Sequence, residues 1–176
     1  METMDLSEAR IYVGTYAKYN NGSLQGEWVE LSDFYDLDDF LERCAEIHED
    51  EDHPEYMFQS WEAIPDCLID EGHLDEAFFC LRDEMDRLHG KEKDAFWVWV
   101  EGESISLTQD AYDLVKSFQC AYMGSYASKE DFAEDFVKLE MELPEFALIY
   151  FDFSKYADDL FCTDFWYEDG YVFRNE

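Results

Sequence analysis

The sequence predicts an α+β fold, arranged as an elongated chain of three small domains. Aromatic residues make up 18% of the 176 residues, which is typical of chains that fold around packed cores. Segments with a strand-like apolar pattern alternate with segments of helical spacing, so both element types are expected. The 45 Asp and Glu residues outnumber the 12 Lys and Arg residues along the whole chain, and the net charge is −33. Self-repulsion of that size destabilises a compact shape and favours an elongated one.

The first domain, residues 1–69, is expected to be a small antiparallel sheet with a helix on one face. β-branched and aromatic residues predict its strands, and Asn20-Asn21-Gly22 predicts a turn between the first two. Asp36 is a natural cap for a helix whose apolar residues recur at helical spacing. In chain order we expect a strand over 10–16, a turn over 18–26, a strand over 28–31, a helix from Asp36 to about His48 and a strand over 56–62.

The second domain, residues 70–106, is expected to be mainly helical, and the third, residues 107–176, to be α+β. An apolar stripe predicts one helix that ends before Gly90. The stripe comprises Leu74, Ala77, Phe78, Leu81, Met85 and Leu88. A short element over 94–100 is interpreted as a helix, although so short an apolar run fits a strand equally well. In the third domain we expect a helix over 111–118, a helix from the Ser128 cap through Phe132, Phe136 and Leu139, a helix over 152–165 and a strand over 171–173.

The five cysteines, at positions 44, 67, 80, 120 and 162, are odd in number and far apart in sequence. The first residues lack the basic start and the apolar stretch of a secretory signal, so we expect reduced thiols in a cytoplasmic protein. Cys67 and Cys80 have apolar neighbours and are predicted to be core residues. No apolar run approaches the roughly 18–20 residues of a membrane span, and no basic patch is present, so neither a membrane nor a nucleic acid is an expected partner.

The sequence carries none of the common enzymatic or nucleotide-binding motifs, and we predict no catalytic residue, no cofactor and no metal site. Cys44 and His48, one helical turn apart, could share a metal ion, but we expect Cys44 to face the core and His48 to lie in a fraying helix end. With 45 acids, some carboxylate pair always has a suitable spacing, so no pair indicates catalysis. An acidic metal-binding or enzymatic protein and an acidic housekeeping domain of a halophile are the alternatives to a binding function.

The amount of acidic charge is comparable to that of a nucleic acid. Duplex DNA carries one negative charge per roughly 1.7 Å, so 33 net charges correspond to about 56 Å of duplex, or roughly 16 base pairs. Acids at i, i+3 and i+4 on a helix lie roughly 5–6 Å apart, a spacing similar to that of phosphates. Carboxylates ordered on a folded scaffold lose less entropy on docking. We therefore predict competitive occupation of a basic groove in a DNA-binding protein, without catalysis.

Several segments between Arg10 and the C-terminus carry a resemblance. They are residues 10–28 (RIYVGTYAKYNNGSLQGEW), 55–59 (EYMFQ) with Ile64-Pro65, 121–124 (AYMG) with 128–133 (SKEDFA), 156–161 (YADDLF) and 170–175 (GYVFRN). Together and in this order, they resemble ArdA-type antirestriction proteins. The resemblance implies a mimic of B-form DNA, encoded on plasmids, conjugative transposons or phages, that inhibits type I restriction-modification enzymes. It also implies three small domains in a row, a homodimer formed through the third domain, and no catalytic residues.

Three groups of acids are predicted to form the DNA-mimicking surface, with a simple solubilising role as the alternative for each. The first group comprises Asp38, Asp39, Glu42, Glu46, Glu49, Asp50, Glu51 and Asp52. The second comprises Asp75, Glu76, Asp83 and Glu84. The third comprises Glu130, Asp131, Glu134, Asp135, Glu140, Glu142 and Glu145. Phe118 and Tyr122, one helical turn apart, are candidates for the dimer interface, with ordinary core packing as the alternative.

Overall fold

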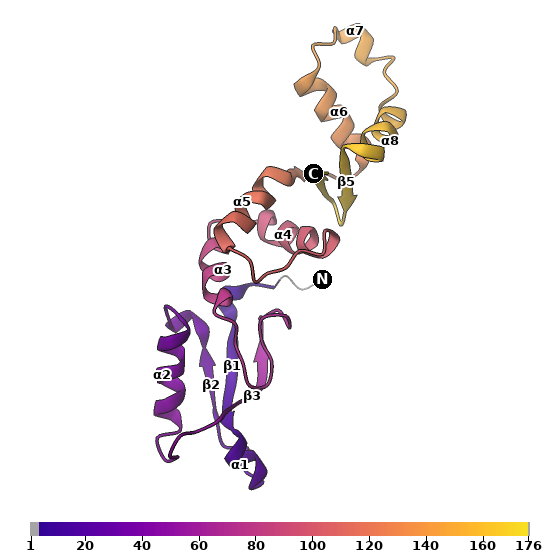
Figure 1. Ribbon diagram of the computed structural model, residues 1–176. Coiled ribbons are helices and arrows are strands. Elements are labelled where there is room, and N and C mark those ends of the chain that lie inside the picture. Colours follow the sequence, from indigo (N-terminus) through magenta and orange to yellow (C-terminus); the bar gives the residue numbers. More distant parts are fainter. Residues whose placement is uncertain (1–3, 176) are drawn as a thin grey trace. The chain divides into compact units, whose positions relative to one another are not determined.

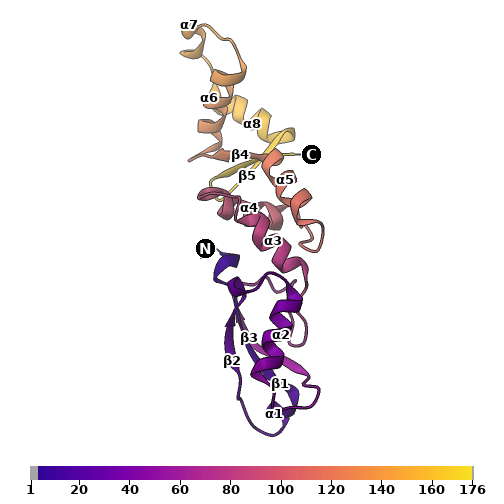
Figure 2. The same ribbon diagram turned by 90° about the vertical axis from the view of Figure 1, so that its left-hand side faces the viewer.

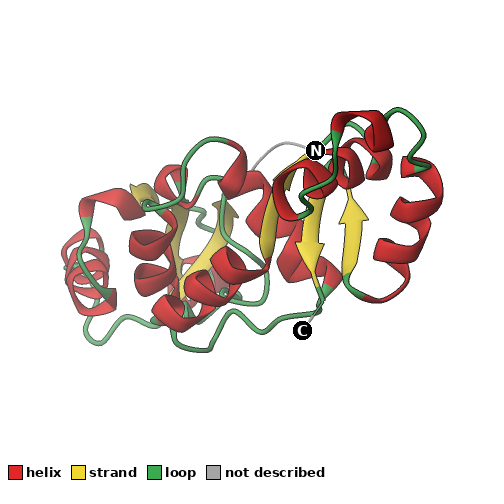
Figure 3. Cartoon of the chain, turned by 90° about the horizontal axis from the view of Figure 1, so that it is seen from above, coloured by secondary structure: helices red, strands yellow, loops and turns green. Residues whose placement is uncertain are grey.

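The computed structural model of the protein describes residues 4–175. The chain divides into two compact units: unit 1 comprises Met1–Asp94 and Ile105–Val115, and unit 2 comprises Ala95–Ser104 and Lys116–Glu176. Helices and two small antiparallel sheets occur together, as the red and yellow elements of Figure 3 show, which confirms the α+β class. The division into three domains stays a prediction.

The sheet of unit 1 has three antiparallel strands in the order β2-β1-β3, and helix α2 lies along it (Figure 1 and Figure 2). The bounds are β1 (Arg10–Thr15), β2 (Glu27–Glu30), α2 (Leu37–Ile47) and β3 (Tyr56–Glu62). In the register of the sheet, Ile11 lies opposite Val29 and Trp61. All four elements were predicted at nearly these bounds, because their apolar periodicity agrees with their burial.

The core of unit 1 forms between this sheet and α2. Ile11 and Val13 of β1 are fully buried, as are Phe40 and Cys44 of α2. The ring of Phe40 lies 5.8 Å from that of Phe58, centroid to centroid. Each fully buried aliphatic or aromatic side chain of this kind stabilises the fold by about 1.5–3 kcal/mol relative to leaving it in water.

Further short elements complete unit 1. They are η1 (Leu6–Glu8), α1 (Tyr16–Asn20), η2 (Leu31–Asp33) and α3 (Ala77–Met85), of which the sequence predicted α3. Helix α1 occupies part of the predicted turn, and Gly22, at φ +78°, makes the turn itself. Helix α3 is shorter than its apolar stripe, because Leu74 instead forms a β-bridge with Ile69. Helices α4 (Lys91–Gly102) and α5 (Ala111–Ala121) each contribute residues to both units, and α4 settles the segment 94–100 as helix.

Unit 2 also contains a three-stranded antiparallel sheet, in the order β4-β6-β5, together with helices α6 and α8, which lie side by side (Figure 1 and Figure 2). The bounds are β4 (Tyr122–Ser125), α6 (Lys129–Glu140), α7 (Glu145–Leu148), α8 (Phe153–Thr163), β5 (Phe165–Glu168) and β6 (Tyr171–Arg174). The sequence predicted α6, α8 and β6. It missed β4, β5 and α7, each only four residues long.

Aromatic rings make up most of the core of unit 2. Phe132 lies 4.9 Å from Phe165 and 5.6 Å from Phe161, between ring centroids. A second group of rings surrounds Phe118. It comprises Phe96, Trp99, Tyr122 and Phe173. Edge-to-face and tilted pairs of this kind contribute about 0.5–1.5 kcal/mol each beyond the area that they bury.

Three predictions about single side chains were wrong. Cys67 and Cys80 are exposed and not core residues, since their apolar neighbours point inward in their place. The third error concerns His48 and is described with its hydrogen bonds below.

Candidate functional site

Most of the acids predicted for the DNA-mimicking surface lie on the outside of the molecule. Of the nineteen, fifteen are exposed, and the other four are half-buried. The half-buried ones are Glu51, Asp75, Glu84 and Glu134. Exposure is the default for carboxylates, so the arrangement of these acids is more informative than their exposure.

Helix α2 presents the first acidic group because its sequence is amphipathic. Phe40 and Cys44 are buried, whereas Asp38 and Asp39 in the first turn are exposed. The helix begins where Asp36 Oδ1 accepts a hydrogen bond from the backbone N–H of Asp39 at 3.0 Å, which confirms the predicted cap. The helix dipole favours acids in this first turn, so the local sequence both starts the helix and places negative charge at its beginning.

A groove in unit 1 brings parts of the first and second acidic groups together. It has a volume of about 700 Å³ and lies between the beginning of α2, helix α3 and residues 108–111. Six carboxylates line it, and no Lys or Arg of the described chain does. The six are Asp36, Asp38, Asp75, Glu76, Asp83 and Asp110. We call this feature the acidic groove.

Backbone N–H groups hold three of these carboxylates in place. Asp36 caps α2, as described. Asp75 Oδ1 accepts from the N–H of Ala77 at 2.9 Å, and Asp110 Oδ1 accepts from the N–H of Asp113 at 3.0 Å. The first turns of three helices therefore meet at the groove, and each supplies an ordered carboxylate. An ordered carboxylate loses little conformational entropy when it binds a cation.

Apolar side chains line the groove beside the carboxylates. Phe79 is only 3% exposed, Leu37 and Ala77 are half-buried, and the ring of Tyr35 is 77% exposed. Arginine and lysine have apolar stems and charged ends, and arginine also stacks on aromatic rings. The acidic groove therefore offers apolar contacts to the stem of a basic side chain, in addition to carboxylates for its charged end.

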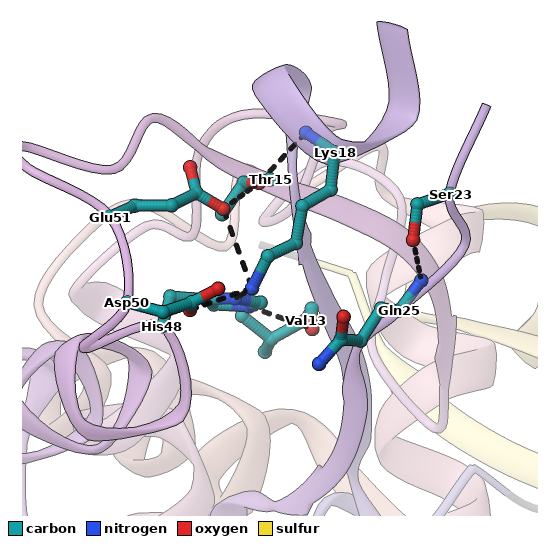
Figure 4. A network of polar contacts seen from close by, with 8 residues as sticks. All are labelled: Val13, Thr15, Lys18, Ser23, Gln25, His48, Asp50 and Glu51. Carbon is teal, nitrogen blue, oxygen red and sulfur yellow. Dashed lines mark hydrogen bonds and ion pairs between the residues drawn. The ribbon is translucent and has the colours of Figure 1, made fainter. Parts of the chain in front are cut away.

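The last acids of the first group lie next to a lysine of their own unit. Lys18 Nζ is 2.9 Å from Asp50 Oδ1, 3.4 Å from Glu51 Oε1 and 3.0 Å from His48 Nδ1 (Figure 4). Thr15 Oγ1 donates a further hydrogen bond to Glu51 at 2.7 Å. The hydrogen bond between Lys18 and Asp50 raises the pKa of the lysine and lowers the pKa of the aspartate. These two acids are partly neutralised within the chain.

His48 is buried, with 1% of its surface exposed, so the prediction of a fraying helix end was wrong. An ammonium group can only donate, so Nδ1 accepts from Lys18 and Nε2 carries the proton. Nε2 then donates to the carbonyl oxygen of Val13 at 3.3 Å. Both ring nitrogens have partners, which is why the ring can be buried. Cys44 is buried as predicted, and burial raises the pKa of its thiol to about 12.

Among residues 4–175, His48, Asp50 and Glu51 are the one group of ligating side chains close enough to share a metal ion. The ammonium of Lys18 lies within hydrogen-bonding distance of all three, in the space that an ion would need (Figure 4). An ion could bind only by displacing it. Cys44, which could have shared a metal with His48, does not belong to the group.

The third acidic group lies in unit 2, mainly on the outer side of α6. Ser128 caps this helix as predicted, since its Oγ accepts from the N–H of Asp131 at 3.1 Å. Phe132 and Val137 face the core, and the acids between them face outward. Lys138 pairs with Glu134 at 2.6 Å. Glu140, Glu142 and Glu145 follow at the end of α6 and the beginning of α7, and all three are exposed.

Phe118 is fully buried within its own chain, so it offers no side-chain surface to a partner. Its ring stacks on that of Tyr122, with centroids 5.3 Å apart, and contacts the rings of Phe96 and Phe173. Phe118 is therefore packed in the core of its own chain, which was the alternative to a dimer contact. Tyr122 is half-buried and takes part in the same cluster.

Sequence analysis missed three residues of the acidic groove and its surroundings. Asp110 was not singled out, although an aspartate directly before a helical stripe is a cap signal. Tyr35 gave no signal, because an exposed aromatic residue cannot be recognised from sequence. Arg82 was also missed: it lies behind the groove, 8% exposed, and a single basic residue on an amphipathic helix normally indicates only a solvated face.

The fold and the groove define a class of protein: a strongly acidic α+β protein that presents ordered carboxylates on its surface. No helix within residues 4–175 has the length and hydropathy needed to cross a membrane. The family of antirestriction proteins called ArdA matches residues 11–173, nearly the whole chain, and the chain therefore belongs to the ArdA family. No curated protein sequence matches it.

Proposed function

We propose that this protein mimics B-form DNA and inhibits type I restriction-modification enzymes by occupying the DNA-binding groove of their methyltransferase core. The observation that carries the proposal is the acidic groove, where six carboxylates and no described cation line one surface. Membership of the ArdA family supports an antirestriction role. We further propose that the protein acts in the cytoplasm by binding alone, without catalysis, a cofactor or a metal, and without contacting nucleic acid itself.

Charge and order together explain how such binding would work. A DNA-binding enzyme presents Lys and Arg side chains at the positions of phosphates, and the net charge of −33 attracts that surface over a distance set by salt. On contact, the exposed carboxylates replace phosphates as partners of these cations. Because the contacts are spread over many acids, no single one should be essential.

Competition binding tests the proposal. The protein is titrated into a type I methyltransferase core that holds labelled duplex, at low and at raised salt. We expect stoichiometric displacement that weakens steeply with salt, since ionic contacts are screened. A folded sample that displaces no duplex at micromolar concentration would rule out the type I target. Stoichiometric ion binding with a pH-dependent activity, or folding only at high salt, would favour the metalloprotein or the halophile alternative.

A matched pair of variants tests whether the acids act collectively. Asp38→Asn with Glu76→Gln removes two charges from the acidic groove, and Asp158→Asn with Asp159→Asn removes two from exposed positions on α8. We expect both double variants to retain most of the inhibition. Loss of all inhibition after a single neutralisation would contradict distributed mimicry.

We propose, in addition, that two copies of the chain associate through unit 2. The support is a set of large apolar side chains that unit 2 leaves on its surface, 69–86% exposed. They are Leu139, Phe146, Ile149 and Tyr150. Sedimentation of Phe146→Ser with Ile149→Ser should show a weakened dimer with unchanged secondary structure. The control is Leu24→Ser, which changes an equally exposed side chain of unit 1, and a monomeric parent chain would contradict the proposal.

A further inference from the structure

Arg82 is the one Lys or Arg that is buried within residues 4–175, although it belongs to a helix of an acidic surface. Its Nη1 donates to the carbonyl oxygens of Leu31 at 2.7 Å and Phe34 at 2.9 Å. Its Nε and Nη2 donate to Asp83 Oδ1 at 2.9 and 2.8 Å. The guanidinium carbon also lies 5.2 Å from the centre of the Phe79 ring. Burial of a charge is costly, and these four hydrogen bonds offset that cost.

These bonds connect the two walls of the acidic groove. Leu31 and Phe34 bracket the turn η2, and the chain continues from Phe34 directly into the cap of α2. Phe79 and Asp83 belong to α3 and themselves line the groove. A single side chain of α3 therefore holds the segment that leads into α2, and with it the carboxylates at the beginning of that helix.

We propose that Arg82 is the positioning residue of the acidic groove: it sets the distance between the carboxylates of α2 and those of α3. The role rests on the function proposed above, because the fixed distance matters only if the groove receives a basic partner. A buried cation at this place reduces the negative potential of the acidic surface. A requirement for net negative charge therefore does not explain Arg82. Lysine could not replace it, because one ammonium nitrogen cannot reach two carbonyls and a carboxylate in this planar arrangement.

The test compares Arg82→Met with Arg87→Met. Both changes remove one positive charge from the same region, but Arg87 is exposed and, within residues 4–175, forms an ion pair only with Glu84, at 2.8 Å. If net charge governs binding, both variants should displace duplex from the methyltransferase core as well as the parent chain or slightly better. If Arg82 positions the groove, Arg82→Met should bind more weakly by about tenfold or more and with a smaller salt dependence, while Arg87→Met stays within about twofold.

Two further measurements separate positioning from a general loss of stability. Backbone hydrogen exchange of folded Arg82→Met should speed up over residues 31–39 and stay unchanged in β1. Arg82→Lys keeps the charge, is the variant to use if Arg82→Met does not fold, and should fail to restore binding. Equal binding by Arg82→Lys and the parent chain, or exchange that rises evenly over unit 1, would overturn the proposal. If the parent chain displaces no duplex, the proposed function fails, while the exchange experiment still tests the role of Arg82.

Discussion

The two units of the chain are stabilised by different interactions. Unit 1 has 29 acids and 7 bases, a net charge of −22, and at least six of those bases form ion pairs with carboxylates of the described residues. Unit 2 has 16 acids and 5 bases, a net charge of −11, and its core is mostly aromatic. Two of its bases, Lys129 and Arg174, lie over the rings of Phe161 and Phe165.

The difference shows how an acidic chain can fold despite its own repulsion. Where the charge is densest, the few cations lie between acidic segments and connect them, as Lys18 and Arg82 do. In unit 2, where the charge is lower, the burial of apolar and aromatic side chains is sufficient to stabilise the fold. Salt and acid should therefore affect mainly unit 1, and truncation of aromatic side chains should cost most in unit 2.

The largest effect is expected from Phe132→Ala, which removes the central ring of unit 2. Phe132 is 2% exposed and packs from α6 against Phe161 of α8 and Phe165 of β5, so the variant should lose about 3–5 kcal/mol of unfolding free energy. Urea unfolding measures the loss. Leu24→Ala, at a side chain that is 66% exposed and lies outside the proposed dimer surface, is the control and should change stability by less than about 0.5 kcal/mol. Equal effects of the two variants would contradict an aromatic core.

Lys18→Met is the corresponding test of unit 1. The change leaves Nδ1 of buried His48 without a donor and brings two carboxylates together without a cation, so we expect a loss of about 1–3 kcal/mol. Lys138→Met breaks a surface pair at i, i+4 in unit 2 and should cost only about 0.3–0.5 kcal/mol. Urea unfolding at low salt should separate the two variants, and similar losses would show that ion pairs matter equally in both units.

The same cluster predicts how stability depends on pH. The hydrogen bond from Lys18 lowers the pKa of Asp50, so in acid the unfolded chain takes up this proton first. The stabilisation is present above the ordinary pKa of aspartate and is lost as the pH falls through the lower folded value. The raised pKa of Lys18 acts at the other end, and its contribution is lost only as the pH rises through that raised value. Asp50→Asn should flatten the acid side of the stability profile.

Helix caps give a smaller effect that should be equal in the two units. Asp36→Ala and Ser128→Ala each remove one side-chain acceptor from a first-turn N–H, and each should cost about 1 kcal/mol. Asp36→Asn keeps an acceptor without the charge and should be nearly neutral. Thermal unfolding followed by circular dichroism measures all three. A loss for Asp36→Asn as large as for Asp36→Ala would mean that charge, and not capping, stabilises the beginning of α2.

An element could be predicted from the sequence where its apolar periodicity agrees with the burial of its side chains. Elements β1, α2 and β3 were predicted because their apolar periodicity matches the core they face, and α6 because Ser128 is a strong cap. Strand β4 was missed since Tyr122 continues α5 without a break, and β5 since Phe165 continues the apolar pattern of α8. Short strands without a turn signal before them are not visible in a single sequence.

The candidate site was predictable only as a set of acids. Asp38 and Asp75 could be chosen as exposed helix residues, but their meeting with Asp110 in one groove depends on tertiary contacts between distant segments. Arg82 and His48 show the same limit from the other side. Both are polar residues that sequence patterns place outside. Both are buried because partners from distant segments complete their hydrogen bonds, the carbonyls of Leu31 and Phe34 for Arg82, and Lys18 and the carbonyl of Val13 for His48.

The smallest effect concerns reactivity and not stability. Cys44, buried in the core of unit 1, has a pKa raised by burial to about 12, while Cys67, Cys80, Cys120 and Cys162 are exposed. Because the thiolate is the reacting species, a thiol reagent at neutral pH should label four cysteines of the native chain and the fifth only after denaturation. Cys44→Ala should keep the four and lose the fifth. Rapid labelling of all five would mean that α2 opens readily from its sheet. The stability of unit 1 would then rest on its ion pairs more than on its apolar core.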